Sequence, residues 1–226
     1  MLRRLFRAPY KSPEEQAYAR LAEKGFQPRS IIDVGAYEGN WTRMAKRLFP
    51  ASPVLMVEAQ ASKVPLLQRV CAEHQDVTLV SAVLAATEGQ AVTFYEMETG
   101  SSLLPEQSDV ERIEAHLSSR TLDGIAADLD GPLFLKIDVQ GAELEVLAGG
   151  ARTLDRCEAV QLEIAVLPYN RGAPTFLEVI QFMDERDFVP YDLAGWSRPN
   201  GVDLVQIDLL FVRRNSPMRP SFFHFG

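Results

Sequence analysis

The sequence predicts an α/β fold, a Rossmann-like, doubly wound and mostly parallel sheet with an antiparallel strand pair at its C-terminal end. Three observations predict it. Short apolar runs alternate with helical patterns from residue 31 to residue 187, as in parallel sheets covered by helices on both faces. The last two apolar runs have no helical pattern between them, which indicates an antiparallel pair at one edge. A length of 226 residues suits one large domain better than two small ones.

The first part of the chain predicts strands and helices in strict alternation. Pro50 ends the second helix, Ser62 is placed to cap the third, and Pro65 is tolerated in the first turn of that helix. The expected helices are 13–24, 38–49 and 62–75, and the expected strands are 31–34, 53–59 and 77–84.

The second part departs from this rhythm before returning to it. Residues 89–97 alternate like an exposed strand, and residues 98–109 read as a loop. The remaining expected elements are a short helix at 121–128, a strand at 132–139, a helix at 142–147, a strand at 159–166, a helix at 175–187, and strands at 188–193 and 205–214 around a loop at 195–201. We expect one domain over 1–226, with a basic arm and helix at 1–28 and an insertion at 89–120 that covers the site.

Composition narrows the possible functions. The formal net charge of −8 is unlike the basic face of a general nucleic-acid binder, so we expect no nucleic-acid partner. Two cysteines and three scattered histidines show neither a disulfide framework nor the spacing of a zinc site, which favours a cytoplasmic protein. No apolar run approaches the ~20 residues of a membrane span, although the basic start "MLRRLFRAPYK" could touch an anionic membrane peripherally. The oligomeric state stays open.

The stretch "IIDVGAYEGNW" predicts a ligand site. A buried strand ends at Val34, the chain turns through Gly35 and Gly39, and a helix begins. Parallel sheets bind ligands at this edge. A dinucleotide site would place a glycine near the position of Tyr37, where a bulky ring instead crowds a pyrophosphate. Glu58 ends the second strand roughly 20 residues further on, where an acid accepts hydrogen bonds from ribose hydroxyls.

Together the turn and the acid indicate a nucleoside-bearing ligand without a pyrophosphate, and S-adenosylmethionine fits both. Asp33 and Glu38 are placed to face its ammonium group. A nicotinamide-dependent oxidoreductase is the alternative enzyme, and a non-catalytic binding or scaffold protein that keeps the fold is the alternative without catalysis.

The chain resembles the FkbM-type methyltransferases, a branch of the class I S-adenosylmethionine-dependent superfamily. The resemblance rests on "IIDVGAYEGNWT", "VEAQ", "VTLVSAVL", "GSSLL", "RTLDGI", "FLKIDVQGAELEVLAGG" and "VQLEIAVLPYNRGAP", in this order between residues 31 and 174. It implies the class I methyltransferase fold, S-adenosylmethionine as cofactor, and O-methylation of a hydroxyl on a sugar, glycan or secondary metabolite. The acceptor class comes from the resemblance alone.

The resemblance also implies residue roles. Gly35, Tyr37, Glu38 and Asn40 would hold the methionine tail, Glu58 the ribose, and Ser81, Ala82 and Val83 the adenine. Asp33, Ala36, Gly39, Ala59 and Asp138 complete the candidate donor site.

The candidate catalytic residues are Lys136, Asp138 and Glu163, which lie on two strands that we expect to be buried on both faces. Buried charges are costly unless paired, so we expect Lys136 to pair with Glu163. Asp138 ends its strand and could act as a base or orient the acceptor hydroxyl, or could instead cap the next helix. Asp138 and Glu163 could also hold a divalent cation.

The acceptor contacts are less sharply indicated. The candidates are Ser101, Ser102, Arg120, Glu143 and Tyr169, and each could instead be an ordinary loop or packing residue. Glu143 could simply interact favourably with the dipole of its helix. The turn after the central strand reads "DVQG" rather than the Asn/Asp-Pro-Pro-aromatic turn of enzymes that methylate exocyclic amines in nucleic acids, which disfavours that use.

Overall fold

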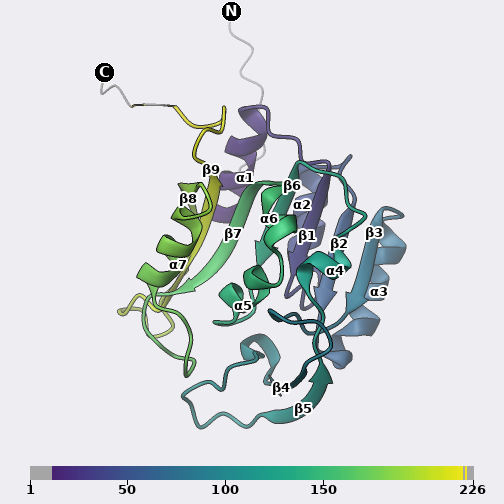
Figure 1. The fold of residues 1–226 in the computed structure, drawn as a ribbon, viewed down its shortest axis with the longest axis vertical. Coiled ribbons are helices and arrows are strands. Elements are labelled where there is room, and N and C mark those ends of the chain that lie inside the picture. Colours follow the sequence, from purple (N-terminus) through teal and green to yellow (C-terminus); the bar gives the residue numbers. More distant parts are fainter. Residues whose placement is uncertain (1–11, 221, 223–226) are drawn as a thin grey trace, which may run out of the picture.

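The computed structural model describes residues 12–220 and 222 and shows a seven-stranded sheet between two layers of helices (Figure 1). The strand order is β3-β2-β1-β6-β7-β9-β8, with β9 and β8 antiparallel to their neighbours and the other strands parallel. The strands of this sheet are β1 (Ser30–Val34), β2 (Val54–Glu58), β3 (Val77–Ser81), β6 (Leu133–Ile137), β7 (Cys157–Ala165), β8 (Phe188–Ser197) and β9 (Gln206–Arg213). The predicted fold class is confirmed.

Each face of the sheet buries its own apolar cluster. Side chains alternate between the faces, so Ile31 and Phe134 point to one cluster while Ile32 and Leu135 point to the other. The first cluster packs under α1 (Pro13–Glu23), α2 (Asn40–Leu48) and α3 (Val64–Glu73). The second packs under α4 (Leu122–Ile125), α5 (Glu143–Ala148), α6 (Ala151–Asp155) and α7 (Phe176–Asp184), which lie in front of the sheet in Figure 1.

A second, two-stranded sheet lies beyond the carboxyl ends of the parallel strands, at the lower end of the molecule in Figure 1. Strand β4 (Ala91–Glu96) was expected, but its partner β5 (Ile113–Ser118) was not. Four of the six β5 residues are exposed, so the sequence shows only a weak apolar alternation there. We call the connection between them, residues 97–112 with a short 3-10 turn η2 at Glu98–Gly100, the covering segment.

Several element boundaries differ from expectation. Ser62 does not cap α3; it lies inside the 3-10 turn η1 (Ala61–Lys63) that leads into the helix, and the cap position makes no side-chain hydrogen bond. Pro65 does fall in the first turn. Strand β8 runs through Ser197 into the expected loop, because its pairing with β9 continues there. The basic residues 1–11 lie outside the described residues, and no described helix is long and apolar enough to cross a membrane.

Candidate active site

The glycine turn after β1 is held against the end of β6. Gly35 has a φ of 75°, and a Cβ there would lie 1.9 Å from the Asp138 carbonyl oxygen. Gly39, with the same φ, precedes α2, and its Cβ would lie 2.6 Å from a methyl group of Val70. Both positions therefore require glycine for conformation and for space. The turn brings its backbone groups close to the carboxyl edge of the sheet.

Glu58, at the end of β2, is oriented by this turn. Its carboxylate accepts a hydrogen bond from the Tyr37 N–H at 2.7 Å and another from the Gln60 N–H at 2.8 Å. Burial raises the pKa of Glu58, and these backbone donors only partly oppose that rise. The carboxylate is thus fixed in direction beside the turn.

A cavity of about 730 Å³ lies at this edge, and its lining includes Gly35, Glu58, Glu163 and Gln206. Its volume is within the range of roughly 300–1,000 Å³ typical of small-molecule sites. The sequence-predicted residues that line it are Gly35, Tyr37, Glu58, Ala59, Ala82, Val83, Ser101, Ser102, Asp138, Glu163 and Tyr169. Those that lie outside its lining are Asp33, Ala36, Glu38, Gly39, Asn40, Ser81, Arg120, Lys136 and Glu143.

Lys136 does not pair with Glu163 as expected. Its ammonium lies 3.3 Å from Asp33 Oδ1 and 3.4 Å from Asp138 Oδ2, and it donates to the Gly35 carbonyl at 3.1 Å. The strand register explains the difference, since Asp33 lies directly beside Lys136 on the neighbouring strand. Burial would lower the pKa of Lys136, but the Asp33 and Asp138 carboxylates outweigh it and raise the pKa.

Glu163 is instead surrounded by neutral donors. Its carboxylate accepts hydrogen bonds from Gln140 Nε2 at 2.7 Å, from the Tyr169 hydroxyl at 2.9 Å and from Gln206 Nε2 at 2.7 Å. Burial, followed by the negative charge of Asp138, raises the pKa of Glu163 well above its ordinary value. Burial and Glu163 likewise raise the pKa of the Tyr169 hydroxyl.

Gln140 joins the two carboxylates. Its amide nitrogen also donates to Asp138 Oδ1 at 3.1 Å, and its backbone has a φ of 56°, which is uncommon outside glycine. Its carbonyl accepts hydrogen bonds from Ser102 Oγ at 2.9 Å and from Asn170 Nδ2. The same residue therefore links β6, β7 and the covering segment.

Glu143 supports this turn from behind instead of facing a ligand. Its Oε1 accepts from the Val139 and Gly141 N–H groups, each at 3.1 Å. Burial raises the pKa of Glu143 to about 7. Asp138 does not cap α5, whose cap position is Ala142 without a side-chain hydrogen bond. The Asp138 side chain is 34% exposed and lines the cavity.

The covering segment closes the cavity near the glycine turn. Glu98 accepts hydrogen bonds from Lys63 Nζ at 2.7 Å and from the Tyr37 hydroxyl at 2.9 Å, and its carbonyl accepts from Gln60 Nε2 at 3.0 Å. Ser101 Oγ bonds within the segment, where it accepts from the Met97 N–H and donates to the Glu98 carbonyl. Arg120 pairs with Glu88 at 2.8 Å, outside the cavity lining, so its expected contact with an acceptor is not supported by its position.

The family model described as "Methyltransferase FkbM domain" matches residues 33–190, more than half of the chain. The chain belongs to the FkbM methyltransferase family. It is therefore a class I, S-adenosylmethionine-dependent methyltransferase by family and by fold. No curated protein is similar enough in sequence to count as a relative.

Three solved structures of methyltransferases are among those similar to this chain. An rRNA methylase from Streptococcus thermophilus has 14% identity and a TM-score of 0.49, over 91% of this chain and 99% of the other. Precorrin-6y C5,15-methyltransferase from Geobacter metallireducens GS-15 has 13% identity and a TM-score of 0.48, over 88% and 87%. Magnesium protoporphyrin IX methyltransferase from Synechocystis PCC 6803, with bound SAM, has 12% identity and a TM-score of 0.48, over 89% and 77%.

The FkbM methyltransferase cavity also contains polar residues that sequence reasoning missed. They are Gln60, Glu98, Thr99, Glu106, Gln140, Ser197 and Gln206. Gln140 lies inside the quoted "DVQG" turn, so its position was visible although its role was not. Gln206 begins β9, whose reversed direction brings that end of the strand to the cavity. A sequence pattern does not show this without the strand order.

In the described residues, few suitable side chains lie close enough together to bind a divalent cation. Among residues 12–220 and 222, no group of three or more histidine, cysteine, aspartate or glutamate side chains could hold a metal ion. Asp138 and Glu163, the expected ligands, are joined by the Gln140 amide, whose nitrogen is a donor and not a ligand.

Proposed function

We propose that this methyltransferase transfers a methyl group from S-adenosylmethionine to a hydroxyl of a sugar, glycan or other secondary metabolite. The observation that carries the proposal is the arrangement of one cavity. Its lining contains a backbone-held carboxylate, Glu58, together with two further carboxylates, Asp138 and Glu163. Such a cavity can orient a nucleoside through Glu58 and activate a hydroxyl beside Asp138.

The residues around the turn fit the donor. The fixed direction of the Glu58 carboxylate suits two ribose hydroxyls. Ala82 and Val83 supply apolar lining suited to an adenine, and Gly35 leaves room at the turn. Asp33, Ala36, Gly39 and Asn40 lie outside the lining, in the end of β1, the turn and the start of α2. When bound, S-adenosylmethionine supplies a methyl group already activated on a sulfonium.

Asp138 is the proposed base. It faces the cavity, and Lys136 and Gln140 fix its two oxygens. The acceptor oxygen forms its bond to the methyl carbon as the carbon–sulfur bond breaks, and Asp138 takes the hydroxyl proton. Glu163 holds Gln140 and Tyr169 in place, and Tyr169, Ser102 and Gln206 are proposed to contact the acceptor. Much of the remaining rate would come from alignment.

The alternatives make different use of the same cavity. A nicotinamide cofactor would bring a pyrophosphate to the turn, where Tyr37 lines the cavity and its hydroxyl bonds Glu98. A scaffold protein would not need the Glu58 carboxylate to be oriented toward a ligand. A nucleic-acid acceptor would place phosphates against a cavity lining that contains no lysine, arginine or histidine.

The test is ligand-dependent thermal stability with S-adenosylhomocysteine, using NAD as the control. Ligand at 100 times its dissociation constant adds about 2.7 kcal/mol, a melting shift of roughly 5–11 °C at this chain length. We expect a shift with S-adenosylhomocysteine alone. A shift with NAD alone would overturn the proposal, and no shift with either would favour the scaffold.

A variant pair locates the binding. Glu58→Gln should weaken S-adenosylhomocysteine binding by about 10-fold or more, because hydrogen bonds to a charged group contribute about 1.5–3 kcal/mol. Glu145→Gln, at an exposed position on α5, is the matched control and should bind like the wild type. Calorimetric titration measures both. Equal affinity in the two variants would place the nucleoside elsewhere.

A further inference from the structure

The cavity lining is charged with one sign only. Five of its side chains are carboxylic acids, and none is a lysine, arginine or histidine. The acids are Glu58, Glu98, Glu106, Asp138 and Glu163. They are distributed along the cavity and come from β2, the covering segment, the turn after β6, and β7.

The nearest cations are already engaged outside the lining. Lys136 is shared between Asp33 and Asp138, so one positive charge faces two negative ones. Lys63 contacts Glu98 at 2.7 Å and lies 4.1 Å from the centre of the Tyr37 ring. Two further acids near Asp138, the buried Glu143 and the half-buried Asp208, add no positive charge. The balance at the end near Asp138 therefore favours a cation.

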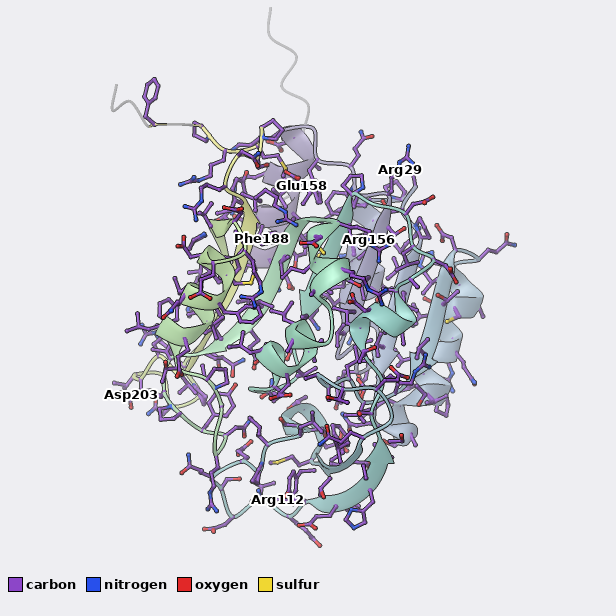
Figure 2. All side chains as sticks on the ribbon, in the orientation of Figure 1. Arg29, Arg112, Arg156, Glu158, Phe188 and Asp203 are labelled. Carbon is purple, nitrogen blue, oxygen red and sulfur yellow. The ribbon has the colours of Figure 1, made fainter. Side chains whose placement is uncertain are left out.

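Arginine side chains lie elsewhere. Arg112 and Arg171 line a separate hollow of about 380 Å³ that shares only Glu106 with the main cavity. Arg112 directs its guanidinium to the Glu106 and Ser108 carbonyls, each at 2.7 Å. Figure 2 shows Arg112 at the lower end of the molecule, whereas Arg29 and Arg156 are labelled in its upper half. An anion near Asp138 would therefore find no arginine partner among the lining residues.

We propose that the acceptor is a hydroxylated amine, such as an aminated sugar, whose ammonium lies beside Asp138 and Glu163 near the hydroxyl that is methylated. Acceptors with a phosphate or carboxylate at that place are excluded. This inference rests on the proposed function and names the charge class of its acceptor.

The same charges determine which acceptor atom reacts. An ammonium close to carboxylates is stabilised in its charged form, so its pKa rises and its nitrogen has no free electron pair. The neighbouring hydroxyl remains the nucleophile, and its proton passes to Asp138 as the methyl group is transferred. The Gln206 and Tyr169 side chains, which already contact Glu163, can hydrogen-bond other acceptor hydroxyls.

The experiment measures binding of four matched probes to the protein saturated with S-adenosylhomocysteine, by saturation-transfer NMR titration. The probes are glucosamine, glucose, glucuronate and glucose 6-phosphate. We expect glucosamine to bind at least 10-fold more tightly than glucose, and the two anions to give no saturable signal. Anions that bind as well as glucosamine overturn the inference, and so does glucosamine that binds no better than glucose.

Two variants show whether the named carboxylates cause the preference. Asp138→Asn and Glu163→Gln each replace one of these carboxyl groups with an amide and should reduce the ratio of glucosamine to glucose affinity at least 3-fold. Glu145→Gln, exposed on α5, should leave the ratio unchanged. An unchanged ratio in both cavity variants would also overturn the inference.

The outcome is separable from that of the proposed function. Binding of S-adenosylhomocysteine is measured first, and its absence contradicts the donor site itself. If S-adenosylhomocysteine binds while the probes show a preference for anions, the methyltransferase function stands and only the charge class of the acceptor is wrong.

Discussion

The two ends of the cavity are built in different ways. At the end near Glu58, backbone N–H groups orient that carboxylate, and Gly35 makes space where the turn meets Asp138. At the other end, the side chains of Asp138, Gln140 and Glu163 orient one another. The first end depends on chain conformation, whereas the second depends on the burial and balance of charge. Substitutions at the two ends should therefore destabilise the protein for different physical reasons.

The sharpest way to break the first end is Gly35→Ala. The added Cβ would lie 1.9 Å from the Asp138 carbonyl oxygen, in a backbone conformation that side chains rarely adopt. Overpacking and positive-φ strain together should reduce the free energy of unfolding by about 5 kcal/mol, since the atom that is struck belongs to the backbone. Urea denaturation measures the loss.

Gly201→Ala is the matched control for this prediction. Gly201 has a φ of 76°, almost the same as Gly35, but a Cβ there meets nothing within 4 Å. Gly201→Ala should lower the free energy of unfolding only by the cost of the positive φ, about 1 kcal/mol. Similar losses for the two variants would show that β1 and β6 do not require close approach at Gly35.

The second end should be broken by Lys136→Met. Methionine keeps the apolar stem but removes the only ion-pair partner that Asp33 has in the described residues. Asp33 is fully buried and Asp138 is partly buried, so two like charges would face each other without compensation. We expect a loss of about 3 kcal/mol in the free energy of unfolding, measured by urea denaturation.

A second substitution identifies the cause of that loss. The double variant Asp33→Asn with Lys136→Met should recover part of the stability, because the asparagine oxygen can still accept the Thr42 hydroxyl that Asp33 accepts at 2.7 Å. No recovery would mean that Lys136 acts through packing under Trp41, which lies 5.9 Å from its ammonium, and not through charge.

The same difference explains how much of the site can be predicted from the sequence alone. The strand, turn and acid of the first end are close in sequence, so the chain order by itself places Gly35, Tyr37 and Glu58 together. The second end joins strands far apart in the chain. The predicted pairing of Lys136 with Glu163 is wrong because only the register places Asp33 beside Lys136. Gln206 reaches the cavity only because β9 is reversed.

The order of elements is also predicted better than their local ends. The parallel core is encoded by apolar runs that are buried on both faces, such as β1 and β6. Strand β5 has no such run, and its place is determined by pairing with β4. Ser62 is a favoured capping residue in general, but here the chain enters α3 through a 3-10 turn that leaves it no capping role.

The smallest expected effect is the pH dependence of stability that the buried Glu143 causes. Burial raises the pKa of Glu143 from its ordinary 4.5 to about 7, and the Asp138 charge adds to that rise. A carboxyl group with a raised pKa binds its proton more tightly in the folded state than in the unfolded state. Its contribution is therefore fully present below about pH 4.5 and is lost as the pH rises towards about 7.

Glu143→Gln should remove this pH dependence while keeping the local structure. The glutamine oxygen can still accept the Val139 and Gly141 N–H groups, and the side chain no longer ionises. Relative to wild type, the variant should gain about 1–3 kcal/mol in the free energy of unfolding between pH 4.5 and pH 7, at about 1.4 kcal/mol per unit of pKa shift. Urea denaturation at several pH values measures the gain. If the difference in free energy of unfolding between the variant and wild type stays constant across that range, Glu143 ionises normally. Burial would then not raise its pKa.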